Sequence, residues 1–166
     1  MKSVDILVAE HKIILGNLRE IEKLIPRLTT ENIQMLTPYL EFLQGYADEQ
    51  HHAREEKILF PWMLQRQPDL QQGPVGLLLK EHVQARAFVA SVTQVVETLV
   101  VDASGVKKVQ ETLNLFLSLY HAHIAKEEDI LYKIAEQIDA KTHDGDKCMF
   151  LEFAKLEREM GVRNGL

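Results

Sequence analysis

Apolar residues recur along this chain at the three- and four-residue spacing of an amphipathic helix, and no stretch alternates with the two-residue period of a strand. Five prolines and eight glycines fall mostly between the periodic stretches. The pattern predicts four long helices and a shorter fifth, joined by short connections. We therefore expect an all-α fold, an up-down-up-down four-helix bundle with a short C-terminal fifth helix.

The helix boundaries follow from the positions of the prolines and the polar turns. We expect Pro26 to end the first helix and Pro61 to end the second. Pro38 either kinks the second helix or lies in the first turn of a new helix that Thr37 caps. The DASG sequence at 102–105 separates the third helix from the fourth. The predicted helices cover residues 3–25, 30–60, 74–99, 106–138 and 147–160.

A polar turn, KTHDGD, divides the chain near its C-terminus. We expect residues 1–140 to form the bundle domain and residues 141–166 to add a turn and a short amphipathic helix packed on the same domain. This last helix either caps the end of the bundle or forms a contact in a homodimer, and capping is the simpler role for a short helix after a turn. Its apolar positions at helical spacing are Met149, Phe153, Leu156 and Met160.

Composition and charge narrow the class of protein. A chain of 166 residues, with 46% apolar and 27% charged residues, suits one globular domain. The net charge of −6 argues against a nucleic-acid partner, which requires a basic face. The single cysteine, Cys148, excludes an internal disulfide framework and suits a reducing compartment. Because neither a signal peptide nor a membrane-length apolar run is present, we expect a cytoplasmic protein without a membrane partner.

Three of the predicted helices carry a histidine in the middle of their apolar stripe. These residues are His11, His82 and His123. A buried imidazole without a partner costs roughly 1–3 kcal/mol, so a single histidine of this kind is most simply hydrogen-bonded to a neighbour. Histidines on several helices at once indicate a shared partner at the centre of the bundle.

An internal repeat relates the two halves of the chain. The segment HHAREEKILF at 51–60 aligns without gaps with HIAKEEDILY at 123–132, and six of the ten positions are identical. A Glu-His dipeptide lies about forty residues before each copy, at 10–11 and at 81–82. Each half therefore reads EH, about forty residues, and then HxxxEExIL.

The repeat distinguishes two overlapping His/Glu pairs in its first copy. Residues four apart share one face of a helix, so either the first histidine acts with the first glutamate or the second with the second. His52 aligns with Ile124, and only the first pair recurs. The recurring pairs are His51 with Glu55 and His123 with Glu127.

The remaining residues of the repeat are assigned by their angle around the helix. The recurring pairs lie in register with apolar residues that we expect to face the core. Glu56 and Glu128 are rotated by about 100° and are predicted to be solvated or rim charges. His52 aligns with an apolar residue and is predicted to be partly buried, as an additional ligand, an outer hydrogen-bonding group or neither. The expected core residues are Ile58, Leu59, Ile130 and Leu131.

Six inward-facing residues gather at the predicted centre of the bundle. Histidine and carboxylate from four helices can bind two metal ions. Two six-coordinate ions need about twelve bonds, and the histidines, two bridging glutamates and a shared oxo or hydroxo group leave about two positions open. Imidazole with carboxylate suits iron, with manganese or zinc possible, whereas one tetrahedral zinc would leave ligands over. The predicted metal ligands are His11, His51, Glu55, His82, His123 and Glu127.

Several further residues are candidates for an outer shell. A metal-binding histidine needs an acceptor for its second ring N–H. Asp48, Glu10 and Glu81 either take this role or remain ordinary surface carboxylates. Tyr120 matches Asp48 in the second copy and either hydrogen-bonds a bound ligand or belongs to the apolar core. Arg86, one turn after a predicted ligand, is interpreted as a surface charge.

These motifs resemble those of the hemerythrin HHE family of cation-binding four-helix bundles. The resemblance rests on the two EH dipeptides, on HHAREEKILFP and on HIAKEEDILY, and it covers roughly residues 3–138. It implies a non-haem di-iron centre with the six residues above as ligands. In this family such centres serve O2 binding, sensing of oxygen, nitric oxide or iron, and repair of iron–sulfur clusters.

Departures from the family patterns narrow these functions. The oxygen-carrying hemerythrins have HxxxH in the third helix and HxxxxD in the fourth, where this chain has Arg86 and Glu127. The iron–sulfur repair proteins resemble this ligand pattern more closely but carry an N-terminal cysteine-bearing domain, which we do not expect here. These departures argue against both reversible O2 transport and the specific role in iron–sulfur cluster repair.

The leading hypothesis is a di-iron binding protein that senses, stores or buffers O2, NO or iron. The alternatives are a di-iron redox enzyme, which reduces peroxide or NO or oxidises ferrous iron, and an iron–sulfur cluster repair factor. A bundle that serves only protein interaction, with metal-free histidines, is the third interpretation. The expected partner is a small diatomic ligand such as O2 or NO.

Overall fold

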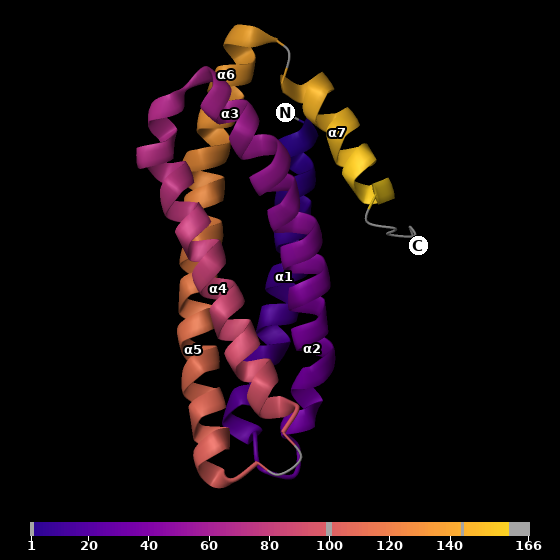
Figure 1. The fold of residues 1–166 in the computed structure, drawn as a ribbon, viewed down its shortest axis with the longest axis vertical. Coiled ribbons are helices and arrows are strands. Elements are labelled where there is room, and N and C mark those ends of the chain that lie inside the picture. Colours follow the sequence, from indigo (N-terminus) through magenta and orange to yellow (C-terminus); the bar gives the residue numbers. More distant parts are fainter. Residues whose placement is uncertain (1, 99–100, 144, 160–166) are drawn as a thin grey trace.

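The computed structural model describes residues 2–98, 101–143 and 145–159, and all regular structure in these ranges is helical. Four long helical columns run alternately up and down, and a fifth helix lies outside them (Figure 1). The predicted all-α bundle with a short C-terminal helix is therefore confirmed.

The columns are built from helices that follow one another with little interruption. The first column is α1 (Lys2–Leu24), and the third is α4 (Pro74–Val96). The second column contains α2 (Thr37–Phe42), the π-helical segments Leu43–His52 and Glu55–Leu59, and α3 (Phe60–Arg66). The fourth column contains α5 (Ala103–Lys126), the π-helical segment Glu127–Leu131 and α6 (Tyr132–Thr142), after which α7 (Gly145–Glu159) follows. Short 3-10 turns cover Ile25–Arg27, Ile33–Leu36 and Pro68–Gln72.

The structure resolves the alternative at Pro38 and corrects the prediction at Pro61. Pro38 lies in the first turn of a new helix, α2, rather than at a kink within a longer one. The cap position is held by Leu36 and not by Thr37. The prediction that Pro61 ends the second helix is wrong, because the helical path continues through α3 to Arg66. The widened π-helical turn just before Pro61 gives its ring room beside the carbonyl four residues back.

The π-helical segments also explain an error in the predicted core. Leu59 and Leu131 are fully buried as expected, but Ile130 is 50% exposed. A π-helix bonds each N–H five residues back, so successive side chains rotate by less than the 100° of an α-helix. Within Glu127–Leu131 this change of angle carries Ile130 outwards while Leu131 stays in the core.

The apolar core is divided into two clusters. One cluster lies towards the end of the bundle with the 25–37 turn and includes Ile14, Leu113 and Phe116. The other lies towards α3, α6 and α7 and includes Leu7 and Leu59. His11 falls between Leu7 and Ile14 along α1, so the predicted ligands form a polar layer with an apolar cluster on each side.

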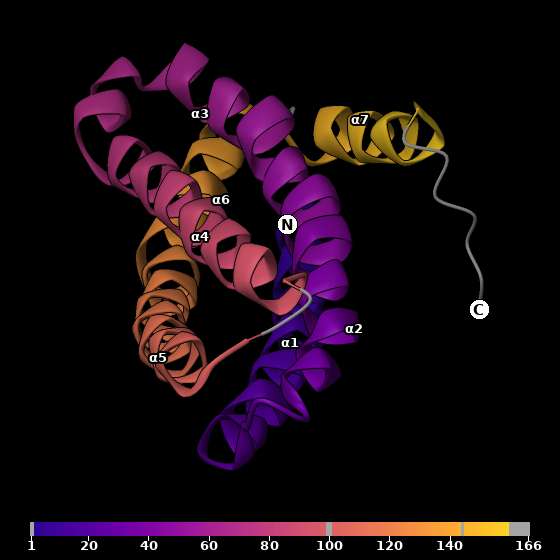
Figure 2. The same cartoon turned by 60° about the horizontal axis from the view of Figure 1, so that its bottom comes forward.

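Helix α7 packs on the outside of the bundle, against α1, α6 and the segment Glu55–Leu59 (Figures 1 and 2). Its buried side chains include Met149, Phe153 and Leu156, as the sequence predicted. Met160 and Leu99, also expected at apolar positions, lie outside the described residues. No helix among the described residues has the length and apolar character needed to cross a membrane.

Candidate metal centre

The structure brings together all six residues that the sequence predicted as metal ligands. They come from four columns of the bundle, and each glutamate is the first residue of a π-helical segment. Their exposed fractions lie between 0% and 2%. The six residues are His11, His51, Glu55, His82, His123 and Glu127.

The four histidines form two pairs that correspond to the two copies of the repeat. His11 Nε2 lies 3.0 Å from His51 Nε2. In the second copy, His82 Nε2 lies 3.1 Å from His123 Nε2. In both pairs the ring nitrogen on the same side of the imidazole, Nε2, therefore faces the centre of the bundle.

The two glutamates lie between the histidine pairs. Glu127 Oε2 is 3.1 Å from His11 Nε2, and its other oxygen, Oε1, is 3.1 Å from His123 Nε2. Glu55 Oε2 is 3.8 Å from His51 Nε2 and 3.5 Å from His82 Nε2. Each carboxylate is thus placed between one histidine of the first pair and one of the second.

The buried oxygen atoms of this centre fit a bound cation. Glu55 Oε2 and both oxygens of Glu127 make no well-formed hydrogen bond, although histidine nitrogens lie nearby. Among the described residues, no lysine or arginine forms an ion pair with either carboxylate. Buried carboxylates without hydrogen bonds or a counter-charge are costly, and the oxygen and imidazole donors here are the ligand types that divalent transition metals prefer.

The charge of the centre is distributed among its carboxylates and histidines. Burial acts to lower the pKa of His82 and of His123, but hydrogen bonding and attraction to Glu127 outweigh it and raise both. Burial, followed by repulsion from Glu127, raises the pKa of Glu55 well above its usual range. Burial also acts to raise the pKa of Glu127, but His123, His11 and His82 outweigh it and hold that pKa well below its usual range. Burial, followed by His11, keeps the pKa of His51 well below normal, so this imidazole is neutral, as a metal ligand must be.

Each histidine of the centre is held from behind by a glutamate. Carboxylates accept, so in each contact the histidine Nδ1–H is the donor, and Nε2 is the ring nitrogen directed towards the centre. Two contacts stay within a copy of the repeat: His51 with Glu10 at 2.9 Å and His123 with Glu81 at 3.0 Å. Two contacts cross between copies: His11 with Glu128 at 2.9 Å and His82 with Glu56 at 2.8 Å.

These contacts both support and correct the sequence interpretation. Glu10 and Glu81 take the outer role that was one of their two alternatives. Glu56 and Glu128 lie at the rim, as predicted, with side chains 26% and 39% exposed, but each also accepts a hydrogen bond from a histidine of the other copy, which the sequence interpretation did not include. The signal that could have found them was present: the second glutamate of EE is identical in both copies.

In each copy of the repeat, a basic residue contacts the outer glutamate of the Glu-His dipeptide. Arg54 contacts Glu10, and the aligned residue Lys126 contacts Glu81. The two basic residues differ in their further contacts. Arg54 also contacts Glu157 of α7, and its guanidinium lies 5.7 Å from the centre of the Phe153 ring. Helix α7 is therefore joined to the metal centre through one arginine and one glutamate.

His52 lies against the centre without pointing into it. Its ring stacks on His82 with centroids 3.8 Å apart and planes 17° from parallel. Both of its nitrogens are engaged, Nδ1 with Asp48 at 3.2 Å and Nε2 with the Tyr120 hydroxyl at 3.0 Å. Stacked rings direct their lone pairs along parallel planes rather than towards a common ion. Although His52 can be grouped with His82 and His123 by distance, this geometry favours the role of an outer group.

Asp48 and Arg86 belong to the same outer group. The structure places Asp48 on His52 rather than on His51, the neighbour that its position one turn earlier suggested. Arg86 is more than a surface charge, because its Nε donates to Asp48 at 2.7 Å and its Nη2 donates to Glu56 at 2.6 Å. Arg86 thus connects the partner of His52 with the partner of His82.

Sequence reasoning missed Tyr132 at the opposite side of the centre. Its hydroxyl donates to Glu55 Oε1 at 2.7 Å and lies 3.4 Å from His11 Nε2. Phe60 is its counterpart in the first copy, so the hydroxyl exists on one side only. The Phe/Tyr difference between the aligned segments was the available signal.

Comparison with known proteins agrees with this arrangement. A family model described as the hemerythrin HHE cation binding domain matches residues 2–135, a range that includes all six converging residues. No curated protein and no solved structure matches the chain.

Proposed function

Because the chain belongs to the hemerythrin HHE cation-binding family, we propose that it binds two non-haem iron ions and that the loaded protein senses, stores or buffers O2, NO or iron. One ion would be held by His11 and His51 and the other by His82 and His123, with the two glutamates shared between them. Manganese and zinc are the competing ions that this ligand set also suits. Bound iron supplies redox chemistry and open coordination positions for a small ligand.

One observation carries the proposal of two ions. The two oxygens of Glu127 each lie 3.1 Å from a histidine nitrogen, and the two histidines belong to different pairs. A carboxylate around a single ion would direct its oxygens to one set of ligands. The placement of Glu127 between two sets is the arrangement expected of a bridging carboxylate in a di-metal bundle.

The residues around the centre prepare it for a cation and a small ligand. The outer glutamates hold the histidine rings so that their Nε2 atoms face the centre, where an ion would bind. The two apolar clusters exclude water on both sides of the polar layer. A dry centre strengthens the attraction between the carboxylates and a cation.

Anaerobic titration with ferrous iron, followed by metal quantification, tests the proposal. We expect about two ions per chain and changes in the optical spectrum when O2 or NO is added. His123→Ala should lose bound iron, whereas His121→Ala, an exposed position on the same helix, should retain it. Failure to bind iron, or equal iron content in the two variants, would overturn the proposal.

Reduction of peroxide is a second candidate function, and Tyr132 is the observation that favours it. Reduction of hydrogen peroxide to two waters consumes two protons and two electrons. The Tyr132 hydroxyl places one O–H within hydrogen-bonding distance of Glu55 at the centre, where a proton could be delivered. Turnover of peroxide with an added reductant, lowered in Tyr132→Phe at unchanged iron content, would favour the enzyme, whereas a stable adduct without turnover would favour the binding protein.

A further inference from the structure

Helix α7 lies outside the four columns of the bundle (Figures 1 and 2). It packs against α1, α6 and the segment Glu55–Leu59, which begins with one of the converging glutamates. The match to the family model ends at residue 135, before this helix begins. Neither the family nor the di-iron proposal therefore gives α7 a role.

A chain of side-chain contacts leads from the first histidine pair to α7. His51 Nδ1 lies 2.9 Å from Glu10 Oε2. The other oxygen of Glu10, Oε1, pairs with Arg54 Nη1, and Nη2 of the same guanidinium pairs with Glu157 Oε1 on α7. Because each contact uses a different atom, Arg54 holds both glutamates at once and neither displaces the other.

The middle of this chain is buried, and α7 helps to bury it. The side chains of Arg54 and Glu10 are 4% and 8% exposed, and that of Glu157 is 35% exposed. The buried ring of Phe153 on α7 also faces Arg54, with its centre 5.7 Å from the guanidinium carbon. If α7 left the bundle, Arg54 would lose the contact with Glu157 and the cover of Phe153, and water would reach its pair with Glu10.

The order of the charges along the chain decides the sign of the coupling. A cation held by the Nε2 atom of His51 strengthens the hydrogen bond from Nδ1–H to Glu10. Arg54 keeps Glu10 in place to accept this bond, and water that reaches the pair weakens their attraction. Departure of α7 should therefore lower the affinity for the cation. Since coupling between two equilibria is reciprocal, a bound cation must strengthen the docking of α7 by the same factor.

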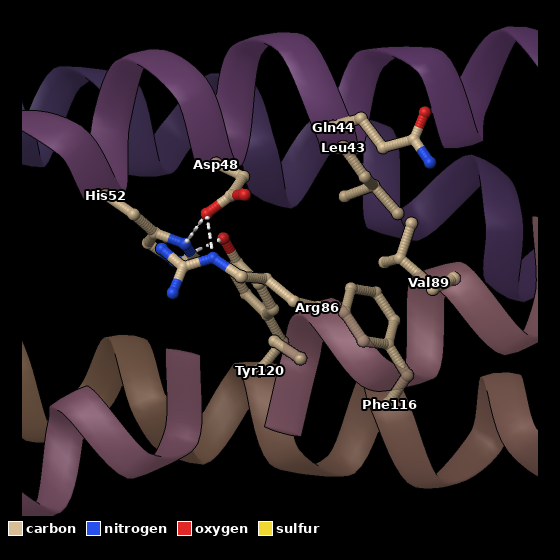
Figure 3. Close-up of a pocket in the computed structure, with 10 residues that line it drawn as sticks. Leu43, Gln44, Asp48, His52, Arg86, Val89, Phe116 and Tyr120 are labelled. Atoms are coloured by element: carbon tan, nitrogen blue, oxygen red, sulfur yellow. Dashed lines mark hydrogen bonds and ion pairs between the residues drawn. The ribbon is translucent and has the colours of Figure 1, made fainter. Parts of the chain in front are cut away.

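The second histidine pair has different surroundings. Lys126, which aligns with Arg54, pairs with Glu81, and its side chain is 32% exposed. Arg86 pairs with Asp48 at a cavity between the second column, α4 and α5 (Figure 3). The ion pairs that the described residues form on this side thus stay within the bundle, and the connection to α7 belongs to the first pair.

We propose that cation binding at the first histidine pair and docking of α7 on the bundle strengthen each other through Glu10, Arg54 and Glu157. The inference rests on the proposed function, because it requires a cation at this pair, and it adds the element of the fold that responds to the cation. Helix α7 is held more firmly in the loaded protein than in the metal-free protein. A change at the buried centre thereby alters the outer surface, where Phe150 and Leu151 of α7 are exposed.

The affinity of the full chain for metal tests one direction of the coupling. Glu157→Gln removes the charge that α7 contributes, and Glu152→Gln makes the same change at an exposed position of the same helix. Anaerobic competition with a chelator measures the affinity for ferrous iron, and zinc is titrated in parallel because the coupling needs a cation rather than iron. Loss of a group bonded directly to a ligand histidine costs roughly 10- to 100-fold in affinity. Because Glu157 lies two contacts further out, Glu157→Gln should bind one ion roughly threefold to tenfold more weakly, and Glu152→Gln should bind as the unsubstituted protein does.

Hydrogen exchange of the α7 amides tests the other direction. In the unsubstituted protein, a bound cation should slow this exchange by a similar factor of roughly three to ten. The slowing should be kept in Glu152→Gln and largely lost in Glu157→Gln, which separates the coupling from a general stabilisation of the fold by the cation. Circular dichroism checks that the variants are folded, and the exchange measured on the unsubstituted protein stands even if Glu157→Gln is not.

The possible results distinguish this coupling from the proposed function. Equal cation affinity in the two variants, or α7 exchange that a bound cation does not slow, would overturn the coupling and leave the di-iron proposal in place. Binding of zinc without binding of iron would refute the di-iron proposal alone, and the zinc data then decide the coupling. Failure to bind either ion would overturn both.

Discussion

Two neighbouring glutamates of the first repeat should respond in opposite directions to the same substitution by glutamine. Glu55 is fully buried, and burial followed by repulsion from Glu127 raises its pKa well above its usual range. Burial acts to raise the pKa of Glu56 too, but hydrogen bonds from His82 and Arg86 outweigh it and lower that pKa. In the metal-free protein, Glu55→Gln should therefore stabilise the fold, and Glu56→Gln should destabilise it.

The expected magnitude for Glu55 follows from proton linkage. Between the ordinary carboxyl pKa and the raised pKa of folded Glu55, the folded state holds more protons than the unfolded chain. The free energy of unfolding of the unsubstituted protein then falls by about 1.4 kcal/mol for each pH unit that the pH rises. Glutamine does not titrate, so the advantage of Glu55→Gln should grow with pH by that amount. For a domain of this size this corresponds to roughly 3–6 °C in Tm per pH unit.

The sign for Glu56 is reversed because its pKa is lowered in the folded state. Its contribution is present above the ordinary carboxyl pKa and is lost as the pH falls. The Glu56 side chain is 26% exposed and that of Arg86 is 38% exposed, so solvent weakens their attraction. We expect Glu56→Gln to cost about 1 kcal/mol at neutral pH.

Thermal unfolding in a chelating buffer, followed by circular dichroism over a series of pH values, measures both effects. Metal titration of the same proteins supplies a second readout. Glu55→Gln should lose a metal ligand outright, and Glu56→Gln should bind metal roughly 10- to 100-fold more weakly through its effect on His82. The reasoning is refuted if metal-free Glu55→Gln is no more stable than the unsubstituted protein, or if its advantage does not grow with pH.

Three further predictions test individual contacts. Tyr132→Phe should lower the free energy of unfolding of the metal-free protein by about 1–2 kcal/mol, as seen by denaturant titration, and leave metal content unchanged; loss of metal would contradict its placement outside the ligand set. Arg54→Met should cost about 3 kcal/mol because it leaves a buried carboxylate without its cation, whereas the aligned but more exposed Lys126→Met should cost about 1 kcal/mol; equal costs would contradict this difference in burial. His52→Ile should keep its full metal content by elemental analysis while His51→Ile loses metal, and the opposite result would make His52 the ligand.

The sequence was sufficient to predict the bundle fold and the six converging residues, because both follow from the periodicity of apolar positions. A long amphipathic stretch defines a face, and a histidine within that face must lie in the core. The doubled HxxxEExIL segment then distinguished His51 from His52, since a face used twice is unlikely to arise by chance. The structure brings together every residue selected in this way.

The outer shell could not be predicted from periodicity because its contacts cross between helices. Glu56 reaches His82 on α4, and Glu128 reaches His11 on α1. A helical wheel describes one helix and assumes the α-helical angle throughout. The π-helical segments at both EE positions alter that angle, and no residue type in the sequence marks where they begin.

The positions where the two copies of the repeat differ are as informative as those where they agree. Phe60 and Tyr132 occupy aligned positions and stack on aligned histidines, Phe60 on His82 with centroids 5.9 Å apart and Tyr132 on His11 at 5.7 Å. The ring positions are therefore nearly symmetric, and the hydroxyl alone is not. A symmetric ligand set needs no such difference to hold two ions.

A second departure lies at the other histidine pair. His52 aligns with Ile124, and Tyr120 aligns with Asp48, so neither residue is repeated in the other copy. His52 and Tyr120 hydrogen-bond each other and help to line a cavity of about 230 Å³, together with polar and apolar residues of the second column, α4 and α5. The Tyr132 hydroxyl thus lies beside His11 of one histidine pair, whereas the other pair adjoins this cavity through His52 and Tyr120. Two ions bound in such a centre would be held by equivalent protein ligands but would meet different surroundings, so the asymmetry that distinguishes their chemistry would come from residues that do not bind metal.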